Sequence, residues 1–426
     1  MNRDFRPEEK PSADEISDVN NSVTDADTDT DAGTLCAGKI PDGTVRSDAD
    51  SVSAISEKAK KYGFFDYCPL PAFVLLCLAV FSAGIHAACV MSVSFSDLMN
   101  RSVSHAIRLI LAEITDILPF SLAETVLLCI PVIAALLIVY SLRVSRDPSM
   151  RRTVRLLTST LAAAALLYSM FALEFAPAYN GSTIEDRLGI DRREVSAEEL
   201  YDTALILSER LGQEADSIPF ISGESSVMPY SLSEMNEKLS TAYASVCGKY
   251  TFVPEMKTRV KPLVISNIMT YTHISGVYTF YTGESNINTN YPDYIIPYTA
   301  AHELSHQRGI AREDEANFMA FLVCMESDDA YIRYSGLANM FEYVSGALYK
   351  ADRSLYNSVL SGIDMRVYGE LYSYSVFFER YSESVASKVS DAVNDTFLKS
   401  QGQKDGTASY GRVVDLAVAY LCRSDG

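Results

Sequence analysis

The residues with the clearest potential for chemistry are His302, Glu303 and His306, which form an HExxH pattern. Residues four apart lie on one face of an α-helix, so both imidazoles can bind a single metal ion. Glu303 then lies beside the ion, where it can act as general base on a metal-activated water. The chain has only 5 histidines, and this spacing arises by chance in roughly one of a few hundred such chains. The alternative, two surface histidines on an amphipathic helix, is therefore the weaker interpretation.

A catalytic zinc site usually has three protein ligands and one open position, so a third ligand must be found. Gly309 lies three residues after His306, and glycine readily adopts the left-handed conformation that ends a helix. The chain would then turn back towards the histidines. One major zincin class has a third histidine six residues after the second, but that position is Arg312 here.

Two glutamates remain candidates for the third ligand. Glu313 together with Asn317 resembles the arrangement of glutamate-type zincins, in which a Glu on the next helix binds zinc. In that arrangement the residue four positions later orients a histidine ligand. Glu315 is the alternative, and it would point to a different face of the same helix. The tight turn at Gly309 decides between the two.

A polar segment precedes the HExxH helix. Glu284, Asn286 and Asn288 alternate along it, so in an extended chain they share one face. In zincins generally, a strand before the active helix offers its free edge to an extended substrate. These three residues are predicted either to form a polar substrate shelf beside the metal or to be a hydrogen-bonded loop that holds the fold.

Composition and hydropathy indicate a membrane protein. The chain has 426 residues and is 48% hydrophobic, and the apolar residues gather in three long runs. Each run has twenty or more residues, which is enough to cross roughly 30 Å of hydrocarbon. The runs are Leu70–Val93, Leu122–Leu142 and Val154–Ala176. The net charge of −19 argues against a nucleic-acid partner, and the 8 scattered cysteines, without CxxC spacing, argue against a cysteine metal site.

Basic residues predict the orientation of these spans. Three lysines between residues 58 and 61 precede the first span, and five arginines between 143 and 155 crowd the loop between the second and third. Both clusters should be cytoplasmic, which places the N-terminus inside and the C-terminal part outside a plasma membrane. The segment between the first two spans then faces out. Its apolar residues from Ile107 to Leu118 have helical spacing, so it is expected to lie along the membrane surface.

Three regions follow from this reading. Residues 1–60 are an acidic cytoplasmic tail that is predicted to be disordered, residues 61–177 hold the three spans, and residues 178–426 form an extracytoplasmic domain. The predicted fold is mainly α, with an α-rich, zincin-like domain and a small β-sheet. Capping boxes predict helices at 197–212 and 232–248, and β-branched residues predict strands at 262–269 and 277–281. Further helices are expected from Pro297 and at 314–326, 329–349, 364–398 and 409–422.

The chain is similar to an uncharacterised bacterial family of multi-span membrane proteins with a C-terminal HExxH domain. The segments that carry this resemblance are 276–278 (GVY), 282–284 (TGE), 286–288 (NIN), 301–309 (AHELSHQRG) and 311–318 (AREDEANF). It covers most of residues 70–422 and excludes the acidic tail. The resemblance implies a membrane-tethered, zinc-dependent, peptidase-like protein.

The expected function is that of a membrane-anchored zinc metallopeptidase acting on an extracytoplasmic peptide or protein. His302, His306 and Glu313 would bind Zn²⁺, and Glu303 would be the catalytic base. Two alternatives stay open. One is a non-catalytic membrane sensor or scaffold with a zinc-binding domain, although a structural zinc normally has four protein ligands. The other is a metal-dependent amidase acting on cell-wall amides.

Overall fold

The computed structural model describes residues 62–147, 149–190, 193, 195–221, 225–381, 384–401 and 412–424. Phe64 and the residues after it form one compact unit, which is mainly helical with small sheets. The predicted fold class is therefore confirmed. The predicted acidic tail, residues 1–60, lies outside the described residues.

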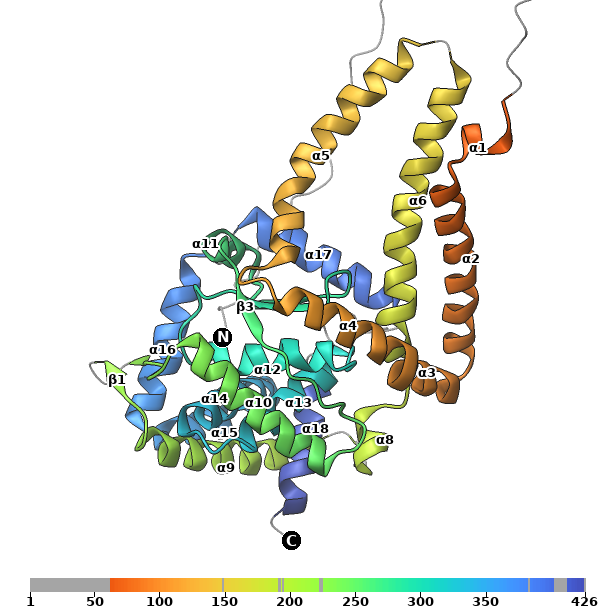
Figure 1. The fold of residues 1–426 in the computed structure, drawn as a ribbon. Coiled ribbons are helices and arrows are strands. Elements are labelled where there is room, and N and C mark those ends of the chain that lie inside the picture. Colours follow the sequence, from red (N-terminus) through yellow and green to blue (C-terminus); the bar gives the residue numbers. More distant parts are fainter. Residues whose placement is uncertain are drawn as a thin grey trace, which may run out of the picture. The chain divides into compact units, whose positions relative to one another are not determined.

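Three helices are long and apolar enough to cross a membrane, as the sequence predicts. They are α2 (Leu70–Met91), α5 (Leu122–Ser145) and α6 (Met150–Glu174). Helices α2 and α6 pack against each other along their length, whereas α5 meets α6 near its own C-terminal end and diverges from it towards the rest of the unit (Figure 1). Every residue from 125 to 140 of α5 is exposed. These apolar side chains are suited to contact with lipid.

The segment between the first two spans packs against the C-terminal part of the chain. It consists of α3 (Val93–Met99), the π-helical turn η1 (Asn100–Ser104) and α4 (His105–Asp116). One face of α4 is buried and carries Arg108, Ala112 and Thr115. Its opposite face exposes Ile110 and Ile114, and Ile117 just after the helix is exposed as well. The predicted amphipathic helix is thus present, and it packs against strand β5 (Glu284–Ile287) of the C-terminal part.

Most of the C-terminal part is a layered helical body. Helices α9 (Ala197–Ala215) and α10 (Leu232–Lys249) begin at the predicted capping boxes, with N-caps Ser196 and Ser231. Two short helices, α7 (Ala176–Asn180) and α8 (Ile184–Leu188), lead into this body from the third span. The later helices are α12 (Ile295–Gln307), α13 (Glu313–Met325), α14 (Ala330–Ala351), α15 (Arg353–Gly362), α16 (Met365–Glu379), α17 (Val385–Ser400) and α18 (Arg412–Ser424).

One predicted helix is wrong in its extent. The run 364–398 is divided into α16 and α17, which take different directions (Figure 1). Helix α16 packs beside a short hairpin of β1 (Phe220–Ile221) and β2 (Ser225–Ser226). Helix α17 instead lies next to the 3₁₀ turn η2 (Thr270–Thr272), which follows α11 (Ser266–Met269). Hydrophobic periodicity alone cannot reveal this break because both halves are amphipathic.

A three-stranded sheet covers α12. Its strands are β3 (Val260–Pro262), β4 (Gly276–Thr279) and β5 (Glu284–Ile287), in the order β3-β5-β4. Strand β5 pairs parallel with β3 and antiparallel with β4. The predicted strand at 277–281 is present, but the one at 262–269 is wrong because α11 occupies 266–269. The hairpin between β4 and β5 turns at Gly283, whose φ is 70°, a conformation that favours glycine.

A buried ion pair joins this sheet to the second span. The Glu284 carboxylate accepts hydrogen bonds from the backbone N–H groups of Leu122 (3.0 Å) and Ala123 (2.8 Å) at the start of α5. It also pairs with the Lys261 ammonium at 2.7 Å, and this ammonium donates to the carbonyls of Thr115 and Phe120. A carboxylate at a helix N-terminus is favourable because it satisfies free N–H groups there. Glu284 therefore fastens α5 to the sheet.

Replacing Glu284 should destabilise the folded protein. Glu284→Ala leaves the Lys261 ammonium buried without its partner, and such a change costs about 3–5 kcal/mol. The free energy of unfolding of the full-length variant in detergent should fall by that amount. The matched control is Glu113→Ala on the exposed side of α4, which should change stability by less than about 0.5 kcal/mol. Equal stability of the two variants would contradict this role for Glu284.

Candidate metal centre

Helix α12 carries the HExxH residues in the middle of the folded body. All of its residues except His302 are buried, so the helix packs on every side and is rigidly placed. The Nε2 atoms of His302 and His306 lie 3.0 Å apart. Both imidazoles thus point to one place from one face of the helix, as the spacing predicts.

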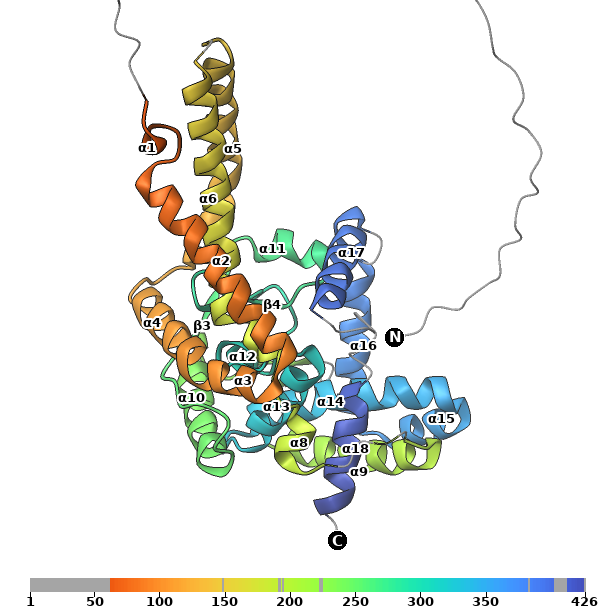
Figure 2. The ribbon, with the colours of Figure 1, turned by 90° about the vertical axis from the view of Figure 1, so that its right-hand side faces the viewer.

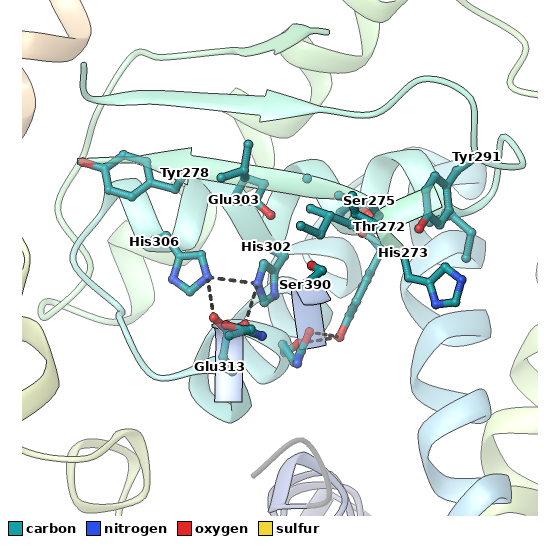
Figure 3. Close-up of a pocket in the computed structure, with 18 of the residues that line it drawn as sticks. Thr272, His273, Ser275, Tyr278, Tyr291, His302, Glu303, His306, Glu313 and Ser390 are labelled. Atoms are coloured by element: carbon teal, nitrogen blue, oxygen red, sulfur yellow. Dashed lines mark hydrogen bonds and ion pairs between the residues drawn. The ribbon is translucent and has the colours of Figure 1, made fainter. Parts of the chain in front are cut away.

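The turn after α12 brings Glu313 back to the two histidines. Gly309 adopts a φ of 85°, and α13 begins at Glu313 itself. Its carboxylate oxygens lie 3.3 Å from Nε2 of His302 and 3.6 Å from Nε2 of His306. The three residues form a cluster that could hold a metal ion, and Figure 3 shows their side chains meeting on one side of the cavity.

The structure places Glu315 away from this cluster. Its carboxylate pairs with the guanidinium of Arg312 at 2.7 Å and accepts a hydrogen bond from the backbone N–H of Ile184. Arg312 in turn donates to the carbonyls of Tyr179 and Gly181. Of the two candidates for a third ligand, the structure brings only Glu313 to the histidines. Glu315 instead ties the start of α13 to the segment after the third span.

The geometry of the cluster fits a four-coordinate zinc ion. Bonds of about 2.0–2.1 Å in a tetrahedral site separate the ligand atoms by about 3.3–3.4 Å. The two Nε2 atoms lie 3.0 Å apart, and each has one oxygen of Glu313 near that distance: Oε2 lies 3.3 Å from His302 and Oε1 lies 3.6 Å from His306. In addition, Nδ1 of His306 donates to the backbone carbonyl of Ile310 at 2.8 Å. This bond leaves Nε2 as the free lone pair, as a metal-binding histidine requires.

Charge also favours a cation at this place. Burial by itself would raise the pKa of Glu313, but the two imidazoles outweigh burial and hold it well below its usual range. Burial lowers the pKa of His306, but the Glu313 carboxylate outweighs it and raises this pKa to about 9. In the metal-free protein, His306 therefore holds an additional proton near neutral pH, at the place where a metal ion would bind.

Glu303 lies beside the cluster, between α12 and strand β4. It is buried, and burial raises the pKa of its carboxyl group although both histidines act in the opposite direction. The backbone N–H of Tyr278 on β4 donates to it. A Cβ atom on Gly276 would lie only 2.6 Å from Oε1 of Glu303. Glycine at 276 is therefore needed so that the strand can approach the glutamate this closely.

Asn317 lies one helical turn after Glu313 and also lines the cavity. Its polar contact is with Tyr298, whose hydroxyl donates to the backbone carbonyl of Asn317 at 2.9 Å. Its amide Nδ2 and the Nδ1 atom of His302 are both buried without a hydrogen-bond partner among the described residues. The expected bond from Asn317 to a histidine ligand is thus not among those that the structure contains.

The predicted shelf residues do not reach the metal cluster. Strand β5, which carries Glu284 and Asn286, is the central strand and not the edge. Asn286 donates to the backbone of its own hairpin, and Asn288 donates to the carbonyl of Ile274. The alternative reading, a hydrogen-bonded segment that holds the fold, describes them. The strand that lies at the cavity is β4, because the hairpin places it at the edge of the sheet.

A cavity of about 940 Å³ opens above the cluster. Strand β4 forms one wall, and aromatic side chains from α7, α12, α14 and α16 form much of the remainder. Helix α17 contributes Ser390 and Asp391 from the other side. His273 lines the cavity too, but its Nε2 donates to the carbonyl of Tyr381 at 3.0 Å, which indicates a structural role (Figure 3).

The turn at Gly309 is held by residues that the sequence analysis did not single out. The side-chain amide of Asn100 donates to the carbonyl of Gly309 at 2.9 Å. The fully buried guanidinium of Arg108 donates to Asn100 and to the carbonyl of Glu174. A Cβ at 309 would collide with both side chains. In the sequence, this set of contacts is indicated only by Arg108, an arginine among the apolar residues of α4.

The two glutamates should differ sharply in metal binding. Glu313→Ala removes a metal ligand and should weaken zinc binding by more than about 100-fold. Even the loss of a residue that only hydrogen-bonds to a metal ligand lowers metal affinity by about 10–100-fold. Glu315→Ala should keep its zinc but lose about 3–5 kcal/mol of stability, because Arg312 then loses its buried partner. Metal content after dialysis and thermal unfolding measure the two effects. Zinc lost from Glu315→Ala and kept by Glu313→Ala would reverse the assignment.

Metal affinity should depend on pH through His306. Because its pKa is raised to about 9 in the metal-free protein, zinc must displace a proton below that pH. The apparent affinity should therefore rise by up to about tenfold per pH unit between pH 6.5 and 9 and then level off. Without metal, the same shift stabilises the fold below about pH 6.5, a contribution lost as pH rises through 9. Competition with a chelating dye measures the zinc affinity at each pH. An affinity that does not change with pH would contradict the displacement of a proton from His306.

Comparison with known proteins adds a family. Residues 100–418 match the family described as "Protein of unknown function (DUF3810)". No curated protein and no solved structure matches the chain. The family match covers well over half of the chain, and it includes the metal-ligand candidates and, from the segment between the first two spans, η1 and α4. The chain therefore belongs to the DUF3810 family.

Proposed function

We propose that this protein is a membrane-anchored zinc metallopeptidase. The observation that carries the proposal is the convergence of His302, His306 and Glu313 on one point, with the buried carboxylate of Glu303 beside it. Two imidazoles and one carboxylate are the ligands of a well-known class of catalytic zinc sites. Zinc is favoured over harder cations because nitrogen supplies two of the three ligand atoms.

Three protein ligands suit catalysis better than a structural role. Structural zinc sites are usually closed by four protein ligands, and among the described residues only three His, Cys, Asp or Glu side chains group at this place. When bound, zinc would supply Lewis acidity, which lowers the pKa of water and polarises a carbonyl group. A sensor or scaffold has no use for an additional buried carboxylate beside such a site.

Glu303 is the proposed general base. It would take a proton from the attacking water and deliver it to the leaving amide nitrogen. The raised pKa of Glu303 suits this role. A general base whose pKa lies closer to the working pH can accept the proton and then release it to the leaving group. The N–H of Tyr278 and the close approach of Gly276 keep the carboxylate in position.

Strand β4 is the proposed guide for the substrate. It is one of the two edge strands of the sheet, and its residues Gly276, Val277 and Tyr278 line the cavity above the cluster. An extended peptide can bind such an edge by main-chain hydrogen bonds. This geometry supports a peptide substrate more than a compact small molecule.

The proposed orientation places the site outside the cell. The C-terminal ends of α2 and α6 and the N-terminal end of α5 all meet the body that carries the cluster (Figure 1). The opposite ends of α5 and α6 flank the arginine-rich loop, which is expected in the cytoplasm. The cluster would then face the extracytoplasmic side of a plasma membrane.

The test is Glu303→Gln in the full-length protein. Loss of a general base should reduce cleavage of a peptide library by about 100-fold or more, while the zinc content stays equal to that of the wild type. Glu237→Gln, on an exposed position of α10, is the matched control and should cleave normally. Zinc-loaded wild type that cleaves no peptide would refute the proposed activity.

A further inference from the structure

An apolar surface lies on the body between the second and third spans. It comprises α11, η2, the outer side of α17 and the residues just before α11. We call this surface the roof face. Its exposed apolar side chains are Val264, Ile268, Tyr271, Val385, Val389 and Val393. Val264 is 86% exposed and Val385 is 78% exposed. An exposed patch of large apolar side chains usually marks an interaction surface.

The roof face is continuous with the membrane spans at both of its ends. At one end, the backbone N–H of Ile265 donates to the carboxylate of Glu124 in the first turn of α5, at 2.8 Å. At the other end, Phe397 of α17 packs edge-on against Phe171 of α6, with ring centroids 6.0 Å apart. The hydroxyl of Ser384 bonds the carbonyl of Tyr271 and so links the two parts of the face. Figures 1 and 2 both show α11 and α17 at the end of the body from which α5 and α6 leave.

The outer side of α17 has the chemistry of a helix that lies on a membrane. Val385, Val389 and Val393 recur every fourth residue and form one stripe, and α17 buries only Ser387 and Leu398. The shallow groove along this side is lined by Val385, Lys388, Val389, Ala392, Val393 and Thr396. It thus has one cation and no acid, in a chain whose net charge is −19. A helix side that carries apolar residues and a lysine favours a bilayer with anionic headgroups.

The metal cluster lies close to the end of the third span. Phe175 directly follows α6, and its ring contacts the imidazole of His306 with centroids 6.0 Å apart. Phe171, one turn earlier in the span, contacts Phe280 at the cavity wall. Phe175, whose ring contacts the candidate ligand His306, thus lies directly after the membrane-spanning helix. The cluster therefore lies close to the membrane-spanning part of the chain.

The inner side of the cavity suits apolar chains. Its described lining includes Phe175, Phe280, Phe378 and six tyrosines, and no Lys or Arg. Apart from the glutamates of the metal site, its one ionisable acid is Asp391 on α17. Outside the metal site, the lining provides no lysine or arginine to pair with a free carboxylate or a phosphate. An internal apolar or aromatic stretch of a polypeptide fits this lining better than an anionic end group.

We propose that the roof face lies in the surface of the lipid bilayer, so that the cavity opens next to the membrane and receives membrane-anchored polypeptides. The bilayer is the occupant of the roof face because that face joins two spans that must themselves contact lipid. The chain to be cleaved is the apolar segment next to a membrane anchor. This second part rests on the proposed peptidase function, whereas the position of the roof face does not.

The absence of tryptophan from the chain permits a direct test of the roof face. Val389→Trp and Ile268→Trp place single reporters on it. Leu136→Trp in α5 is the reporter inside the membrane, and Leu205→Trp, on α9 at the far end of the body (Figure 1), is the matched control. The full-length variants are placed in vesicles whose acyl chains carry bromine, which quenches tryptophan only at short range.

The roof reporters should lose emission as Leu136→Trp does, relative to vesicles without bromine, while Leu205→Trp keeps its emission. If Val389→Trp and Ile268→Trp both behave like Leu205→Trp, the roof face does not touch the bilayer and the proposal is overturned. This readout needs neither zinc nor catalysis, so it fails or succeeds independently of the proposed function.

The substrate class is tested with one apolar, aromatic peptide sequence in two forms. In the first form it follows a transmembrane helix in the same vesicles as the wild-type protein, and in the second it is free in solution. Confinement to the bilayer should raise the cleavage rate at least about tenfold, and Glu303→Gln gives the background. Equal rates for the two forms would overturn the assignment of membrane-anchored substrates. Cleavage of neither form, with the roof reporters still quenched, would refute the peptidase function and leave the membrane contact standing.

Discussion

The reversal of the chain at Gly309 is the constraint on which the metal cluster depends. Helix α12 presents two imidazoles from one face, but a third ligand must come from elsewhere in the chain. Five residues separate the end of α12 from the start of α13, and a φ of 85° at Gly309 reverses the chain within them. Glu313 is then the first residue of α13 and faces the histidines. A longer connection would carry Glu313 past the cluster, and a side chain at 309 would displace Arg108 and Asn100.

Buried polar groups tie this turn and the sheet to the membrane spans. Arg108 connects the turn, through Asn100, to the carbonyl of Glu174 at the end of α6. On the other side of the cluster, the hydroxyl of Tyr278 on β4 donates to the carboxylate of Glu174 at 2.5 Å. Buried polar groups of this kind are costly unless each has a partner. Anchoring in the membrane and the shape of the site are therefore parts of one structure.

Much of the fold could be predicted from the sequence because the decisive signals are local. Twenty apolar residues in succession define a span, and a capping box at Ser196 or Ser231 defines where a helix begins. The HExxH spacing requires only that 302–306 be helical, which makes the pairing of His302 with His306 a local prediction as well. The placement of Glu313 needed one further local feature, the glycine that turns the chain.

The remaining features depend on contacts between distant segments. Alternation of Glu284, Asn286 and Asn288 correctly indicates an extended chain, but it does not say which strand lies at the edge of the sheet. The turn at Gly283 places β4 there, and so Gly276 and Tyr278 meet Glu303. In the same way, Arg108 belongs to the core only because α4 packs on the turn at Gly309. Neither relation can be read from periodicity, since each joins residues that are far apart in the chain.

The central claim is an open zinc site with two histidines and one glutamate, and X-ray absorption at the zinc edge tests it most directly. The full-length protein is loaded with one equivalent of zinc, and the first coordination shell is measured. The account predicts two imidazole nitrogens, with oxygen as the remaining ligands, one from Glu313 and the other from solvent. A shell that contains sulfur, four protein ligands or a single imidazole would contradict it, as would a protein that retains no zinc.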